Sequence, residues 1–281
     1  MSLSLSSLYT PLVTSGLLDT CPMLEAYVAA FSFLFWHILF FYLTRVSTVK
    51  RFRFENSFKR ESSPLTSKPL FTVATASDVT AVLSLPVYLF SISLFHSVKE
   101  KTISPDSDVA PSLSRLTVEL LAGIFMYDLV FFFIHLLLHR SKFLYRHVHS
   151  RHHTHEFLSV GTTVSHSLFD GILQVATNIF VQHLGLFGWG TKHPLSRLLH
   201  NVVITYMLCE IHSELDAPFS MHSLCPSICG GALRHRYHHA YTQPGFKGRK
   251  GVHYQEFFRY LDDYFGTAVT DEECRRVVYQ I

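Results

Sequence analysis

Charged residues are scarce in this chain of 281 residues. Asp, Glu, Lys and Arg make up 16% of it, whereas soluble globular proteins contain about 25%. Hydrophobic residues make up 48%, and Phe alone occurs 25 times. This composition excludes a disordered, collagen-like or coiled-coil protein and favours a membrane protein. The formal net charge is only +3, which is too small to indicate a nucleic-acid partner.

Cysteine is also scarce, and the five residues show no pattern of a disulfide framework. Cys225 and Cys229 are four residues apart, unlike the CxxC pairs of zinc knuckles, so we expect two buried thiols. Residues 1–23 have no Lys or Arg and no small-residue cleavage pattern, so we expect no cleaved signal peptide. The chain also lacks a Walker loop, GxSxG, HExxH and the Glu-x-x-His pairs of carboxylate-rich di-iron bundles.

Five apolar segments are expected to form helices, and the first runs for 18 residues without a formal charge, close to bilayer length. The last two are separated by GTKHPLSR, which predicts a helical hairpin, so the number of full crossings is four or five. We therefore expect an all-α, polytopic integral membrane helical bundle. The expected segments are 26–43, 79–95, 116–138, 168–189 and 198–209.

The basic residues predict the orientation of these helices. Of the 24 Lys and Arg residues, 19 lie in the segments that follow the first, third and fifth apolar stretches. The positive-inside rule makes these segments cytosolic and the N-terminus lumenal or extracellular. We divide the chain into an N-terminal membrane region, 1–115, with two spans, and a second region, 116–281.

Histidine is abundant, with 19 residues, and its distribution follows the predicted topology. Twelve of the 19 lie at or just beyond the cytosolic ends of the third and fifth spans, although the topology was assigned without them. We therefore expect a His-rich cap on the cytosolic side. The twelve are His135, His139, His147, His149, His152, His153, His155, His212, His222, His235, His238 and His239.

The spacing of these histidines suits metal binding. They occur as HLLLH (135–139), HSRHH (149–153) and HRYHH (235–239), so residues i, i+3 and i+4 can share one helix face. Neutral imidazole is a ligand for Zn, Fe, Cu and Ni. Eight imidazoles exceed the four ligands of one tetrahedral zinc. The spacing therefore predicts two metal ions.

Asp128 lies seven residues before His135 and eleven before His139, on the same helix face. A carboxylate inside an apolar span is costly and usually functional. We expect it to accept the free N–H of a ligating imidazole and thereby to orient the ring. The alternative is a hydrogen-bond partner between helices with no role at a metal.

The three histidine motifs, in this order, resemble those of the fatty acid hydroxylase superfamily of membrane di-iron enzymes. That superfamily includes sterol C4-methyl oxidases, sterol C5-desaturases, cholesterol 25-hydroxylases and sphingoid-base hydroxylases. The resemblance covers about 116–267 and includes SKFLYRHVHSRHH (141–153), EIHSELDAPFSMHS (210–223) and FFRYLDDYFGT (257–267). The chain departs from the family pattern at Leu261, where Trp is common, and at His253, where Asn is common. Ser167 and Phe169 replace the Pro and Glu that usually follow a His at the position of His166.

The resemblance implies two irons that activate O2 and hydroxylate an unactivated C–H bond of a lipid. It further implies the endoplasmic reticulum membrane, an active site facing the cytosol, and a cytosolic electron donor such as cytochrome b5 or its reductase. His147 and His155 are expected beside the site or in solvent, and the roles of His166 and His253 are open. The expected ligands are His135, His139, His149, His152, His153, His212, His222, His235, His238 and His239.

Several alternatives remain at this stage. A desaturase would use the same oxidant, and sterol, sphingoid-base and fatty acyl substrates are not distinguished. An inactive scaffold that binds metal would keep the same motifs. A membrane metal transporter would need polar ligands along a path deep inside the spans, whereas these histidines gather at helix ends. Five further histidines are expected to be structural or interfacial, namely His37, His96, His183, His193 and His200.

Overall fold

The computed structural model describes residues 5–46, 52–54, 76–98, 109–154, 158–185, 191–241 and 252–279. Within these ranges the protein is helical, and two isolated bridges, Arg53 to Leu215 and Cys229 to Phe258, are the only β-type pairing. The helices are α1 (Leu5–Thr14), α2 (Leu17–Thr20), α3 (Leu24–Leu43), α6 (Ala76–Val98), α7 (Leu113–Arg140), α8 (Lys142–Leu144), α9 (Leu168–His183), α10 (Pro194–Ile211), α11 (Met221–Leu224), α12 (Gly231–Tyr241), α13 (Tyr260–Phe265) and α14 (Asp271–Val278). Three short turns complete the set: a π-helix, η1 (Tyr145–His149), and the 3₁₀ helices η2 (His152–Thr154) and η3 (Val160–Val164).

Four of the five predicted apolar segments lie within helices, namely α3, α6, α7 and α10. The segment 168–189 is helical over α9, which ends at His183, and its residues 186–189 lie outside the described residues. Within the described residues, only α3 and α7 are both long enough and apolar enough to cross a membrane. The apolar part of α6 is limited to Ala81–Leu94 and contains Pro86. Four or five complete crossings therefore remain a prediction.

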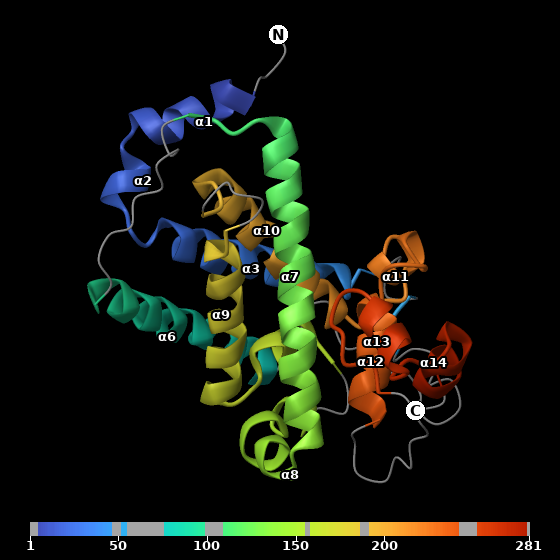
Figure 1. Ribbon diagram of the computed structural model, residues 1–281. Helices are drawn as coiled ribbons and strands as arrows, with labels where there is room; N and C mark the ends of the chain where they lie inside the picture. The colour runs from blue at the N-terminus through green and yellow to red at the C-terminus, as the bar shows by residue number, and fades with distance from the viewer. Residues whose placement is uncertain are drawn as a thin grey trace.

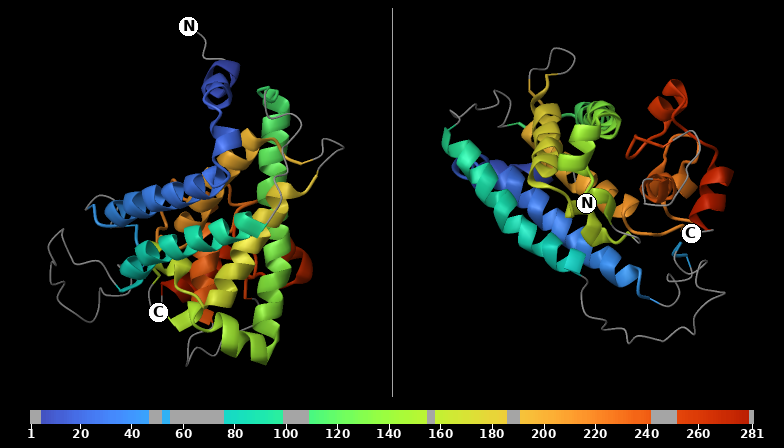
Figure 2. Two further views of the ribbon diagram at one scale, coloured as in Figure 1. Left: turned by 90° about the vertical axis from the view of Figure 1, so that its left-hand side faces the viewer. Right: turned by 90° about the horizontal axis from the view of Figure 1, so that it is seen from below.

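Helix α7 forms the long axis of the molecule (Figure 1). It begins where the Ser112 hydroxyl accepts a hydrogen bond from the backbone N–H of Arg115, a normal N-cap. Helices α9 and α10 both pack against α7, and α10 also packs on α3. Seen from below, α3 and α6 lie side by side at one side of α7, and α12 to α14 lie at the other (Figure 2).

The core between these helices is apolar, but the outer faces are apolar too. Ile124, Phe131 and Ile204 belong to a buried cluster that joins α7 to α9 and α10. On the outside, Phe31 is 67% exposed on α3 and Phe90 is 70% exposed on α6. Large exposed apolar faces on helices of this kind indicate a membrane protein.

Candidate metal centre

Nine of the ten predicted ligands meet at one end of α7. His135 and His139 come from the last turns of α7, His212 caps the end of α10, and three others project from α12. The remaining three come from the short turns after α8. All nine are buried except His139, which is half-buried. They separate into two groups, which we call the first group (His135, His139, His149, His153 and His238) and the second group (His152, His212, His235 and His239).

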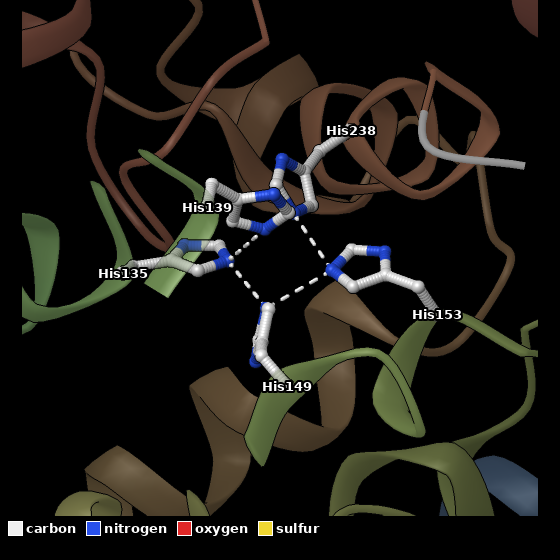
Figure 3. A group of neighbouring side chains, drawn as sticks. All are labelled: His135, His139, His149, His153 and His238. Carbon is white, nitrogen blue, oxygen red and sulfur yellow. Dashed lines mark hydrogen bonds between the residues drawn. The ribbon is translucent and has the colours of Figure 1, made fainter. Parts of the chain in front are cut away.

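The imidazoles of the first group face a common centre (Figure 3). The Nε2 atom of His149 lies 3.1 Å from that of His135 and 3.0 Å from that of His153. The Nε2 atoms of His139 and His238 lie 3.2 Å from those of His135 and His153, respectively. Five rings from three separate segments therefore present the same nitrogen to one point.

The second group has the same arrangement. The Nε2 atom of His235 lies 3.0 Å from that of His212 and 3.1 Å from that of His239. The Nε2 atoms of His212 and His152 are 3.5 Å apart. In both groups the candidate ligand atoms lie within 4.8 Å of one another.

Each HxxHH motif contributes to both groups. Sequence spacing predicts that all three imidazoles of a motif share one face. Instead, His149 and His153 belong to the first group and His152 to the second. On α12, His235 and His239, one turn apart, join the second group, whereas His238 joins the first. The two motifs thus cross-link the two groups.

The hydrogen bonds of the outer ring nitrogens show that the inner nitrogens carry lone pairs. The Nδ1 atoms of His135 and His238 contact the carbonyl oxygens of Tyr254, at 2.7 Å, and Val252, at 2.8 Å. Carbonyl oxygens only accept, so each Nδ1 carries the proton and each neutral ring leaves Nε2 as an acceptor. Facing lone pairs repel one another unless a cation lies between them.

The spacing of the nitrogens fits such a cation. With metal–nitrogen bonds of about 2.0–2.1 Å, adjacent ligand nitrogens lie about 2.8–3.4 Å apart for octahedral to tetrahedral angles. The observed Nε2 separations run from 3.0 to 3.5 Å, within this range or just above it. The residues present therefore fit metal ions in both groups.

Burial keeps five of these imidazoles neutral. Removal from water, followed by repulsion from neighbouring imidazoles, lowers the pKa of these five rings well below the usual 6.5. A neutral imidazole is the form that ligates a metal, so no proton must leave before binding at neutral pH. The rings outside the apolar helices to which this applies are His152, His153, His235, His238 and His239.

Asp170 is the carboxylate that contacts the first group, and sequence reasoning missed it. Its Oδ2 atom accepts a hydrogen bond from Nδ1 of His149 at 2.8 Å, and both side chains are buried. Ser167 caps α9 and thereby places Asp170 in the first turn. The sequence signal that could have revealed Asp170 is its position as a single carboxylate at the start of the predicted apolar segment 168–189.

Contrary to the expectation from the sequence, Asp128 does not contact an imidazole. Its two oxygens accept hydrogen bonds from the side chain of Gln255 and from the backbone N–H groups of Glu256, Phe257 and Phe258. The buried Asp128 carboxylate on α7 thus accepts hydrogen bonds from four donors, all of which lie in residues 255–258. Because Tyr254 directly precedes these residues and holds His135, Asp128 acts on the site through the backbone.

A buried Glu214 links three parts of the site. Its Oε1 atom accepts a hydrogen bond from the backbone N–H of Leu158 at 2.8 Å and pairs with Arg236 of α12 at 3.3 Å. Its own carbonyl accepts a hydrogen bond from Phe54 N–H. With φ at 61°, Glu214 has a left-handed backbone that is rare outside glycine. Packing on all sides holds this conformation.

His222 is the predicted ligand that lies outside both groups. Its Nε2 atom contacts Asp216 at 2.9 Å, and Asp216 also pairs with Arg275 and Tyr279 near the C-terminus.

Among the described residues, the other histidines whose roles the sequence left open, and the two cysteines, also lie outside the two groups. His147 is exposed, His166 contacts the Ser167 carbonyl, and His253 lies against Cys274 and Val269. His155 lies outside the described residues. Cys225 is exposed and Cys229 half-buried, so the expectation of two buried thiols was wrong.

The fold and the site define a class of protein: an all-helical chain in which two groups of buried imidazoles, able to hold metal, lie at the ends of apolar helices. The model of one family, fatty acid hydroxylase, matches residues 120–267. The chain belongs to this family.

The names of the similar proteins describe reactions on sterols. Cholesterol 25-hydroxylase of Rattus norvegicus is 30% identical over 200 residues, which are 68% of this chain and 59% of the relative. The human protein of that name is 28% identical over 193 residues, 66% of this chain and 62% of the relative. Methylsterol monooxygenase 2-2 of Arabidopsis thaliana is 29% identical over 198 residues, 69% and 66% of the two chains. The matches span about 60% of the length of the first two relatives. No solved structure gives a significant match.

Proposed function

We propose that the protein is a membrane-bound non-haem di-iron lipid hydroxylase. The observation that carries this proposal is the convergence of nine Nε2 atoms, eight of them on buried histidines, into two groups with metal-like spacing. Family membership supports iron as the metal, because the family uses iron. The match covers 120–267, which lies within the proposed catalytic region, 116–281. The two groups would hold one iron each, through their Nε2 atoms.

Iron bound at these nitrogens would supply the activation of O2 and the attack on an unactivated C–H bond. Hydroxylation consumes one O2, two electrons and two protons for each lipid molecule and releases one water. The chain itself orients the ligands through Asp170, Tyr254 and Val252. Burial of eight of the nine histidines, with His139 half-buried, limits the access of bulk water to the reacting centre.

The substrate, electron donor and compartment are parts of the same proposal. The names of the relatives favour a sterol-like lipid, and the exposed apolar helices would place the chain in its membrane. Charge asymmetry supports an active site on the cytosolic face of the membrane. The family resemblance favours the endoplasmic reticulum as the compartment. Electrons would then come from a cytosolic donor such as cytochrome b5 or its reductase.

Expression in yeast that lacks its own sterol and sphingoid hydroxylases, followed by lipid mass spectrometry and metal analysis, tests the proposal. We expect about two irons for each chain and a new lipid that is heavier by one oxygen atom. A lipid lighter by two hydrogens would identify a desaturase. Zinc together with unchanged lipids would contradict the proposal and favour an inactive metal-binding protein.

A further inference from the structure

A second buried polar cluster lies beside the first halves of α7 and α10, whereas the histidine groups lie at the other ends of these helices. Its centre is formed by Lys192, before α10, and His200, on α10, which are 1% and 0% exposed. Both reach α7 at Gly123. A Cβ atom at Gly123 would lie 2.6 Å from Nζ of Lys192 and 2.8 Å from Nδ1 of His200. Both nitrogens therefore lie against the part of α7 where Gly123 has no side chain.

The two nitrogens are a donor and an acceptor that lack partners. Nε2 of His200 lies 3.1 Å from the amide oxygen of Asn178, which only accepts, so Nε2 carries the proton and Nδ1 carries a lone pair. The Lys192 amine is a donor. Among the described residues neither atom has a hydrogen-bond partner. Leaving both buried is unfavourable unless a ligand satisfies them.

A hydroxyl group has the matching chemistry, because it can accept from Lys192 and donate to His200. A carboxylate or a ketone has no proton for His200. The Asn178 amide that faces His200 is held in place by a further hydrogen bond, because its nitrogen donates to Oδ1 of Asn201 on α10. Gln182 donates to the same oxygen. The cluster therefore favours an alcohol over an anion.

The distance to the metal centre is the same along both helices. Gly123 precedes His135 by twelve residues on α7, and His200 precedes His212 by twelve residues along α10. At 1.5 Å for each residue, both separations are about 18 Å. Apolar side chains on these stretches, among them Tyr127, Phe131 and Ile204, pack together in the core, and the buried carboxyl groups of Asp128 and Glu210 lie on the same stretches. A lipid that reaches both places must therefore span about 18 Å between its hydroxyl group and the carbon that is oxidised.

We propose that Lys192 and His200 bind the hydroxyl group of the lipid substrate and thereby select a carbon at the opposite end for oxidation. This inference rests on the proposed function and adds a regiochemistry to it. Oxidation at a carbon beside the hydroxyl would require that group to lie at the metal centre, about 18 Å from this site.

Sterol binding to the full-length chain, purified in detergent, tests the site without any need for turnover. The probes are cholesterol, its 3-deoxy analogue and its 3-ketone. We expect the unchanged chain to bind cholesterol about tenfold more tightly than the deoxy analogue, with the ketone between them. Lys192→Met is expected to weaken cholesterol and ketone binding about tenfold, whereas His200→Phe weakens only cholesterol binding. Lys142→Met, at an exposed lysine, is the control.

Equal affinity of the unchanged chain for the three sterols would overturn the proposal, because the pair would then hold water only. That comparison needs no variant and survives a folding failure of Lys192→Met. Equal losses for cholesterol and the deoxy analogue would reveal a structural role and also overturn it. In the turnover assay, a product oxidised beside the hydroxyl contradicts the proposal. If no lipid is oxidised, the proposed function fails, while the binding series still decides the hydroxyl site.

Discussion

The two histidine groups differ in how their outer ring nitrogens are held. In the first group three Nδ1 atoms contact acceptors from other segments, and one of these acceptors is the Asp170 carboxylate. In the second group, His212 contacts the carbonyl of Leu208 within its own helix. Nδ1 of His152 is buried and has no acceptor among the described residues.

This difference has a consequence for metal binding. Acceptors beyond the ligands fix the orientation of each ring and increase its basicity. A carboxylate acceptor does so more strongly than a carbonyl, because hydrogen bonds to charged groups are stronger. We therefore expect the first group to bind its metal more tightly and the second group to exchange its metal more readily.

Removal of one ligand from either group is expected to have the largest effect. His238→Ala breaks the first group and His152→Ala the second, and each should reduce lipid oxidation about 10³-fold or more, because two-metal chemistry needs both sites. Membrane insertion should be unchanged. His147→Ala, at an exposed histidine outside both groups, is the control. Normal lipid oxidation in either ligand variant would contradict the metal assignment.

Asp170→Asn tests the strongest acceptor of the first group. Loss of its charge beside His149 should weaken metal binding about 10- to 100-fold at that group and leave the second group unaffected. Metal titration of the apoprotein measures both sites. Asp263→Asn, at a partly exposed carboxylate paired with Arg259, is the matched control and should change neither site. Equal weakening at both sites would refute the distinction between the groups.

Chelation should separate the groups in time. We expect roughly half of the metal to leave in a fast phase, from the second group, and the rest more slowly. Metal analysis of samples taken during incubation with a chelator measures both phases. His152→Ala should remove the fast phase, whereas Asp170→Asn should bring the two phases together. A single phase in the unchanged chain would contradict the predicted difference.

Asp216 gives a pH dependence outside the metal groups. Burial raises its pKa, but hydrogen bonds from His222 and Tyr279 and the charge of Arg275 outweigh burial and lower the pKa to about 2. The usual Asp pKa is about 3.9, so this stabilisation is complete above that pH and is lost as pH falls towards 2. Thermal unfolding of Asp216→Asn should therefore differ from that of the unchanged chain above about pH 4 and converge with it near pH 2. A constant difference across this range would contradict the assignment.

His222→Ala is expected to have the smallest effect on the centre. His222 contacts Asp216 rather than either group, so metal content should stay at about two ions. The thermal midpoint should fall by a few degrees, because a buried hydrogen bond is lost. Loss of one metal ion would restore His222 to the ligand set and contradict the geometric grouping.

Much of the candidate centre was predictable because ligand spacing is a local property. His135 and His139 are one turn apart on a helix whose apolar length is visible in the sequence, and nine of the ten predicted histidines meet in space. The contacts of Asp128 and Asp170 were not predictable. Both carboxylates lie in apolar segments, and only the packing of α9 and of 254–258 decides which one reaches an imidazole.

The sequence by itself determined the helical class, the apolar segments and the three histidine motifs, because helix periodicity and hydropathy act between near neighbours. Only the tertiary structure decided how each HxxHH motif divides between two groups and where His222 lies. It also decided that Lys192 and His200 meet at Gly123. These contacts join residues that are distant in the chain, and they depend on how whole helices pack, which local spacing does not encode.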